Sequence, residues 1–87
     1  MTETHITTID ANHFQVRIVS NTTTSHNVTV QTDYAQKLTS GTISIADLIH
    51  QSFEFLLERE PNTSILRSFD LSVIAHYFPE YEREMNK

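Results

Sequence analysis

The stretches FQVRIV (Phe14–Val19) and NVTVQT (Asn27–Thr32) decide the fold of this chain. In both, β-branched or aromatic residues alternate with polar ones, which is the pattern of a strand that buries one face. Residues 20–25 between them are polar and turn-forming. We therefore predict an antiparallel hairpin with strands near residues 13–20 and 26–32, whose apolar face needs a cover.

Outside the hairpin, the composition of the chain changes from strand-like to helix-like. Residues 5–10 are a candidate edge strand, although they alternate less regularly than the hairpin does. After residue 33 the chain is rich in Leu, Phe, Ile and Glu, and its apolar residues recur at helical spacing. Strands followed by helices indicate an α+β layer fold. We expect the hairpin to pack on helices at about residues 33–39, 44–60, 63–68 and 70–78.

The segment 44–60 is the predicted main helix. Ser44 is a candidate N-cap, and Pro61 disfavours helical backbone at the residue before it. The apolar stripe of this helix is wider than a surface helix needs. Two explanations remain open, because the helix could lie between the hairpin and the last helix of one chain, or one flank could be a dimer interface. We accordingly expect a monomer or a homodimer.

Length and composition limit the class of protein. A chain of 87 residues fits one domain, which we take as residues 1–87, with residues 1–4 and 82–87 frayed. The chain has no cysteine, so disulfides and thiolate metal sites are excluded. No apolar run approaches the roughly 20 residues that cross a bilayer. The polar N-terminus has no signal-peptide pattern, and we expect a cytoplasmic protein without membrane partners.

The charge balance argues against nucleic acid as a partner of the monomer. Eleven acidic residues outnumber six basic ones, which gives a net charge of −5. Affinity for nucleic acid comes largely from Lys and Arg side chains that neutralise phosphates. The six basic residues are scattered along the chain and form no patch or stripe.

The sequence carries no pattern typical of an active site or a cofactor site. No two of the five histidines are three or four residues apart, so no helix would present a pair of them to a metal ion. With one glycine in the chain, neither a phosphate-binding loop nor a nucleophile elbow can be built. We predict a non-enzymatic protein without a metal or cofactor. The histidines are His5, His13, His26, His50 and His76.

Candidate partner-binding residues gather near the predicted break between the helices. Aromatic and arginine side chains are enriched in protein interfaces. Together with the wide apolar stripe and the missing catalytic patterns, they favour an interaction domain that binds a protein partner of unknown identity. The candidate residues are Arg59, Arg67, Tyr77 and Tyr81.

The C-terminal half resembles a known family. The stretch SFEFLLEREPNTSILRSFDLSVIAHYFPEYE, Ser52–Glu82, is similar to a family of small uncharacterised bacterial proteins, and HNVTVQTDYAQKLTSG, His26–Gly41, is similar to it too. The resemblance implies a bacterial, cytoplasmic, free-standing domain. It implies no activity and transfers no functional residues.

A second resemblance gives an alternative function. A strand at residues 27–32, a short helix, and a helix that opens with Ser44 resemble the ribbon-helix-helix DNA-binding fold. In that family a dimer reads the major groove with alternate residues of a two-stranded ribbon, and amides at the helix start meet phosphate. The matching outward residues would be Asn27, Thr29 and Gln31, which are hydrogen-bonding types suited to base edges.

Overall fold

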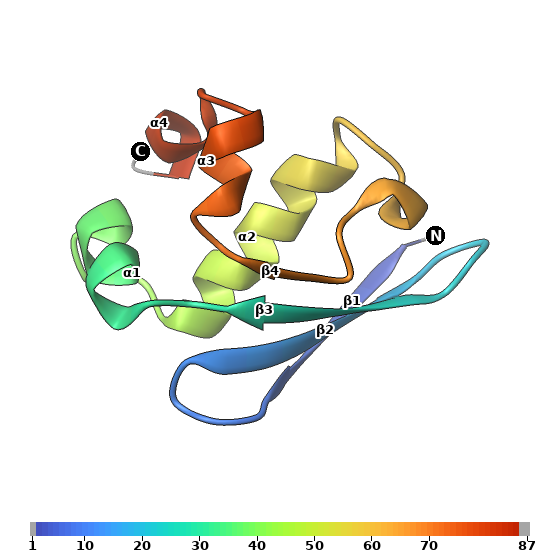
Figure 1. Ribbon diagram of the computed structural model, residues 1–87, viewed down its shortest axis with the longest axis horizontal. Coiled ribbons are helices and arrows are strands. Elements are labelled where there is room, and N and C mark those ends of the chain that lie inside the picture. The colour runs from blue at the N-terminus through green and yellow to red at the C-terminus, as the bar shows by residue number, and fades with distance from the viewer. Residues whose placement is uncertain (1, 86–87) are drawn as a thin grey trace.

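The computed structural model describes residues 2–85 as a four-stranded mixed sheet covered on one side by helices (Figure 1). β1, β2 and β3 are antiparallel neighbours, and β4 pairs with β3 in the parallel sense. The expected α+β class and the hairpin packed on helices are confirmed. The strands are β1 (Glu3–Thr8), β2 (His13–Val19), β3 (Thr24–Thr29) and β4 (Ser68–Asp70), and the helices are α1 (Thr32–Thr39), α2 (Ile45–Leu57), the 3-10 turn η1 (Asn62–Ser64), α3 (Val73–Tyr77) and α4 (Tyr81–Met85).

The core lies between the sheet and α2. In β2, alternate residues are buried while those between them are exposed, because a strand points successive side chains to opposite faces. Phe53 of α2 is fully buried and lies with its ring centre 5.6 Å from that of His26 in β3. Burying a side chain of this size stabilises a fold by about 1.5–3 kcal/mol. The buried residues of the hairpin are Phe14, Val16, Ile18, His26 and Val28.

The wide apolar stripe of α2 is covered within one chain. One flank packs on the sheet, and on the other flank the ring of Phe55 meets those of Phe78 and Tyr81 at 5.9 and 5.3 Å between centres. Phe55 is only 4% exposed. The first of the two explanations for the stripe therefore describes the fold, and this helix leaves no broad apolar flank for a dimer.

The start of α2 and the end of α1 have clear caps, whereas α1 begins after Gln31 without a side-chain cap. Ser44 caps α2, because its side-chain oxygen accepts a hydrogen bond from the Asp47 amide at 3.1 Å. α1 ends through two left-handed residues, Ser40 with φ of 57° and Gly41 with φ of 71°. The glycine tolerates this conformation without steric cost, which explains why the break falls here.

The bounds of several predicted elements need correction. The strands predicted at 13–20, 26–32 and 5–10 lie at 13–19, 24–29 and 3–8, because residues 30 and 31 leave the sheet and residue 32 already begins α1. The main helix ends at Leu57 rather than at residue 60, because the chain turns before Pro61.

The largest corrections concern the predicted helices at 63–68 and 70–78. Residues 62–64 form only the η1 turn, and residues 68–70 form β4, so the sheet gains a strand where we expected a helix. The last predicted helix shortens to 73–77, since Asp70 is the last residue of β4 and the Leu71 amide still donates to the Thr29 carbonyl of β3.

The ends of the chain are more ordered than we expected. Residues 3 and 4 belong to β1, and residues 82–85 belong to α4, so these parts of the predicted frayed tails are regular structure. Residues 1, 86 and 87 lie outside the described part of the chain. Between residues 2 and 85, no helix is long and apolar enough to cross a membrane.

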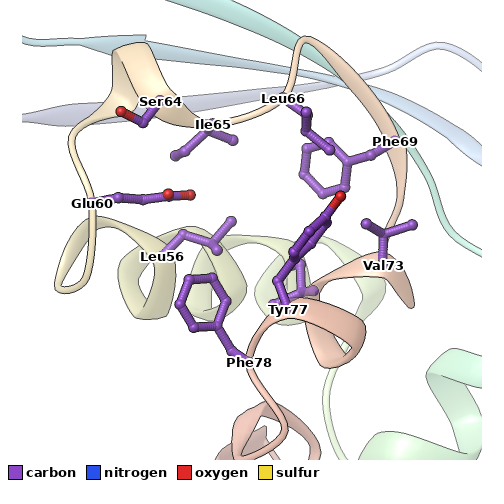
Figure 2. Close-up of a pocket in the computed structure, with 10 residues that line it drawn as sticks. Leu56, Glu60, Ser64, Ile65, Leu66, Phe69, Val73, Tyr77 and Phe78 are labelled. Carbon is purple, nitrogen blue, oxygen red and sulfur yellow. The ribbon is translucent and has the colours of Figure 1, made fainter.

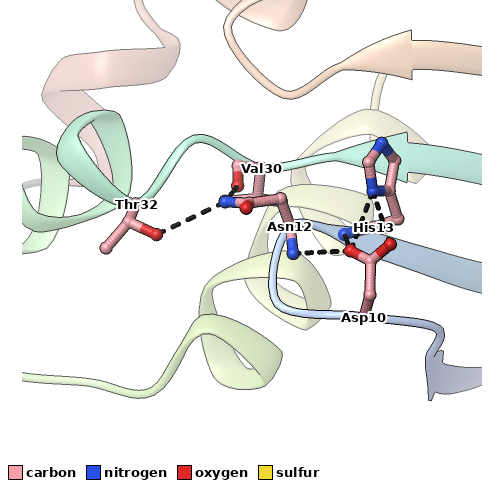
Figure 3. Close-up of polar contacts among 5 residues, drawn as sticks. All are labelled: Asp10, Asn12, His13, Val30 and Thr32. Carbon is pink, nitrogen blue, oxygen red and sulfur yellow. Dashed lines mark hydrogen bonds and ion pairs between the residues drawn. The ribbon is translucent and has the colours of Figure 1, made fainter.

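A polar turn fixes the connection between β1 and β2 (Figure 3). The Asp10 carboxylate accepts hydrogen bonds from the backbone amides of Asn12 and His13, both at 2.9 Å, and lies 2.8 Å from Nδ1 of His13. These hydrogen bonds lower the pKa of Asp10, and the bond from the Asn12 amide has the largest effect. The Asn12 side chain donates to the carbonyl of Val30 at 2.9 Å, which ties the turn to the chain that enters α1.

Candidate functional site

An apolar cleft of about 290 Å³ opens beside β4, between the chain that leads into this strand, α3 and the end of α2. Leu56, Ile65 and Ile74 are buried at its base, whereas Leu66 and Tyr77 stand at its rim, 49% and 64% exposed. Figure 2 shows Leu66 and Tyr77 on the same side of the cleft. Exposed apolar residues that share one hollow mark interaction sites more often than isolated ones do.

Glu60 is the charged residue that lines this apolar cleft. It follows the end of α2, and Figure 2 shows its carboxylate directed inward, toward the side of Leu56 and Ile65. Glu60 forms no salt bridge with another residue of the described range. The cleft therefore combines an apolar lining with a carboxylate that has no cationic partner between residues 2 and 85.

The backbone of β4 presents a free edge next to the cleft. The Asn27 amide donates to the Arg67 carbonyl at 2.6 Å, and the Leu71 amide donates to the Thr29 carbonyl at 2.8 Å. Because backbone groups alternate along a strand, residues 67, 69 and 71 face β3, and the amides and carbonyls of Ser68 and Asp70 face away from it. These outward groups have no hydrogen-bond partner among the described residues.

A polar hollow lies on the other side of the same segment. It is lined by residues 22–26 of the β2–β3 loop and strand, together with Asn62, Thr63, Ile65 and Arg67. Its volume is about 480 Å³, larger than that of the apolar cleft. Size alone would make it the better candidate, but the side chains of Thr24, His26 and Asn62 within it already bond to one another.

The bonds inside the polar hollow form a continuous chain. His26 Nδ1 lies 2.7 Å from the Leu66 carbonyl oxygen, and His26 Nε2 lies 2.8 Å from the Thr24 hydroxyl. Asn62 donates to that hydroxyl at 3.0 Å and to the Thr22 carbonyl at 2.7 Å. Since a carbonyl can only accept, Nδ1 carries a proton. In the neutral ring Nε2 then accepts from the Thr24 hydroxyl, which in turn accepts from Asn62. Every group in the chain is satisfied, which is typical of a structural network.

Two of the predicted partner-binding residues are engaged within the chain. Tyr81 is fully buried, and its hydroxyl lies 2.6 Å from that of Ser52, so its place in the candidate interface must be corrected. It escaped prediction as a core residue because it follows Pro79 in a charged tail. Arg59 lies with its guanidinium carbon 3.5 Å from the centre of the Phe55 ring and its Nε 3.6 Å from Glu80.

The other two predicted residues lie in different hollows. Tyr77 stands at the rim of the apolar cleft, and Arg67 lines the polar hollow, so the four predicted residues do not form one surface. Sequence reasoning missed Glu60, Leu66 and Phe69. The adjacent pair Ile65–Leu66 was the available signal, because in an extended chain two neighbouring apolar residues cannot both face the core.

The three residues predicted to contact DNA do not form one surface either. β3 is paired with β2 on one edge and with β4 on the other, so it has no free edge to form a ribbon with a second subunit. Asn27 is exposed on the open face of the sheet and Thr29 is half-buried. Gln31 lies beyond the end of β3, with its side-chain amide 3.5 Å from Asp70. This arrangement does not supply the reading surface that the resemblance implies.

The histidines do not converge on a common site. His5, His13 and His50 each pair with a nearby carboxylate at the surface, at 3.3, 2.8 and 2.7 Å. In the range 2–85, no three His, Asp or Glu side chains come together in a way that could hold a metal ion.

Known proteins give no further guide to the site. Comparisons with protein-family models, with curated proteins and with solved structures found no match to this chain. The resemblances of residues 52–82 and of the strand–helix–helix pattern therefore stay predictions. The apolar cleft and the β4 edge are the candidate site that the geometry favours.

Proposed function

We propose that this chain is a non-enzymatic protein-interaction domain, which binds an extended segment of a partner protein along β4. The partner segment adds a short strand to the free edge, and its side chains enter the apolar cleft. The observation that carries the proposal is the position of unpaired backbone groups of Ser68 and Asp70 beside the exposed Leu66 and Tyr77. Strand addition of this kind takes affinity from the backbone and specificity from pockets for alternate side chains.

The size and charge of the cleft favour a peptide segment as the occupant. A volume of about 290 Å³ lies at the lower limit of small-molecule sites, which hold about 300–1,000 Å³, and suits one or two side chains. The carboxylate of Glu60 gives the cleft a negative charge, so a segment with a positive charge complements it. A second copy of this chain complements it less well, since each copy carries a net charge of −5.

The setting of the domain belongs to the same proposal. The resemblance of residues 52–82 implies a bacterial, cytoplasmic protein, and we adopt that setting. The absence of catalytic patterns in the sequence supports a binding role rather than an enzymatic one.

The experiment that tests this function is selection of random displayed peptides of about eight residues on the immobilised protein. We expect enrichment of peptides with apolar or long side chains at alternate positions. Leu66→Asp should weaken the enriched peptides at least about tenfold, because a hydrated carboxylate replaces the apolar side chain against which the peptide packs at the rim. Ile9→Asp is the matched control, because Ile9 is also an exposed aliphatic residue, 58% exposed, but lies in the β1–β2 turn. It should leave the affinity unchanged.

A second variant tests the strand edge separately from the cleft. Ser68→Pro removes an outward amide without removing a bond to β3, and proline is tolerated on edge strands whose amides face solvent. We expect a folded protein with weaker peptide binding. No enrichment of any peptide, or equal binding to the wild type and to Leu66→Asp, would refute the proposal. A wild-type dimer that Leu66→Asp converts to a monomer, seen by light scattering, would instead make a second copy the occupant.

A further inference from the structure

Resting on the proposed function, we infer that the side chain that fills the apolar cleft is a lysine or an arginine, bound through Glu60. The carboxylate of Glu60 points into the cleft and has no salt bridge in the described chain (Figure 2). A charged group beside carbon walls gains most from a partner that brings both an opposite charge and an apolar stem. Lysine and arginine are the side chains with that combination.

The two cations of this chain that lie nearest to Glu60 in sequence do not line the apolar cleft. Arg59 stacks on the ring of Phe55, donates to the Phe55 carbonyl at 3.0 Å and meets Glu80 at 3.6 Å. Arg67 lines the polar hollow on the far side of the segment. Glu60 therefore stays available for a cation from outside.

The walls of the cleft suit the stem of such a side chain. Leu56 and Ile65 offer an aliphatic base on the side of Glu60, so a stem of three or four methylenes is buried while its charged end reaches the carboxylate. The rings of Phe69, Tyr77 and Phe78 border the rest of the cleft.

The test uses the peptide that binds most tightly in the selection, synthesised with lysine, norleucine or glutamate at the position that enters the cleft. Norleucine keeps the apolar stem and removes the charge. We expect the lysine peptide to bind the wild type about three- to fivefold more tightly than the norleucine peptide, as for a partly exposed ion pair. The glutamate peptide should bind most weakly of the three.

Two isosteric variants assign the effect to one carboxylate. In Glu60→Gln the preference for lysine over norleucine should fall below about twofold. In Glu58→Gln it should persist, because that change removes the same charge from an exposed residue that does not line the cleft. Fluorescence anisotropy at low and high salt measures the affinities of both peptides for each variant. The preference of the wild type for the lysine peptide should decrease at high salt.

The outcomes separate this inference from the proposed function. A selected consensus without lysine or arginine, or a lysine preference that survives in Glu60→Gln, overturns the inference. If the inference is overturned but the norleucine peptide binds Leu66→Asp more weakly than the wild type, the proposed docking site stands. If neither peptide responds to Leu66→Asp, the docking site fails and the inference fails with it.

Discussion

The two hollows that border the segment from Asn62 to Asp70 differ in how their polar groups are satisfied. In the polar hollow, Asn62, Thr24 and His26 bond to one another and to backbone carbonyls. In the apolar cleft, the carboxylate of Glu60 and the outward backbone of β4 have no such partners in the described chain. The first hollow is larger, but the second adjoins a strand edge whose outward backbone groups have no partner in the described chain.

This difference separates a structural role from a binding role. Buried polar groups are costly unless they are bonded, so a completed network fixes the fold and has little left to offer a ligand. Where exposed apolar residues lie beside unpaired backbone donors and acceptors, a partner can bury the apolar surface and form the missing hydrogen bonds. Changes in the polar hollow should therefore affect stability, and changes at the rim of the cleft should affect binding.

The largest expected effect comes from His26→Ala. This change removes a buried ring that contacts Phe53 and leaves the Leu66 carbonyl and the Thr24 hydroxyl without their partner. We expect the free energy of unfolding to fall by about 3 kcal/mol, measured by urea denaturation.

His5→Ala is the control for that measurement. His5 lies on β1 at the surface, 3.3 Å from Glu3, and an exposed pair of this kind contributes little. We expect a change within about 0.5 kcal/mol. A loss at His26 no greater than the loss at His5 would show that the network is not what fixes the β2–β3 loop to the following segment.

An intermediate effect is expected at alkaline pH from Tyr81. Its burial raises the pKa of the phenol above the ordinary value, despite the hydrogen bond with Ser52. The folded state thus binds the proton more tightly than the unfolded state, in which the pKa is about 10. This contribution is complete below about pH 10 and is lost as the pH rises above it, by up to about 1.4 kcal/mol per pH unit.

Two variants sharpen the alkaline measurement. Tyr81→Phe should flatten the fall of stability with pH, and the remaining slope then comes from Tyr34, whose pKa is raised by partial burial and by the bond that it donates to Glu82. In a Tyr77→Phe background, tyrosinate absorbance should rise together with the loss of folded signal. Absorbance that rises near pH 10 while the protein stays folded would contradict the burial of Tyr81.

The sequence predicted the regular parts of the fold better than it predicted the site. Period-two alternation identified β2 and β3, and a cap with a long apolar stripe identified α2, because these signals extend over many residues. β4 was missed because Ser68, Phe69 and Asp70 are too few to show a period, and their pairing partner lies 41 positions away in the sequence, at Asn27↔Ser68. The cleft was missed for the same reason. Because residues 63–68 were predicted to be a helix, Leu66 was not recognised as part of an extended segment beside β4.

The smallest expected effect on stability belongs to the rim of the cleft, and neighbouring residues offer the sharpest contrast. Ile65 and Leu66 have the same side-chain composition, but Ile65 is 6% exposed and Leu66 is 49% exposed. Ile65→Ala should lower the free energy of unfolding by about 2 kcal/mol, whereas Leu66→Ala should change it by less than about 0.5 kcal/mol. Urea denaturation of both variants measures this difference directly.

Leu66→Ala is informative because it removes only the side chain. The Leu66 carbonyl still accepts from His26 Nδ1, so the polar hollow keeps its bonds while the cleft loses part of its rim. If Leu66→Ala weakened selected peptides without lowering stability, the two hollows would be functionally separate. If it destabilised the fold as much as Ile65→Ala does, Leu66 would be a core residue, and the cleft would lose its main claim to be a binding site.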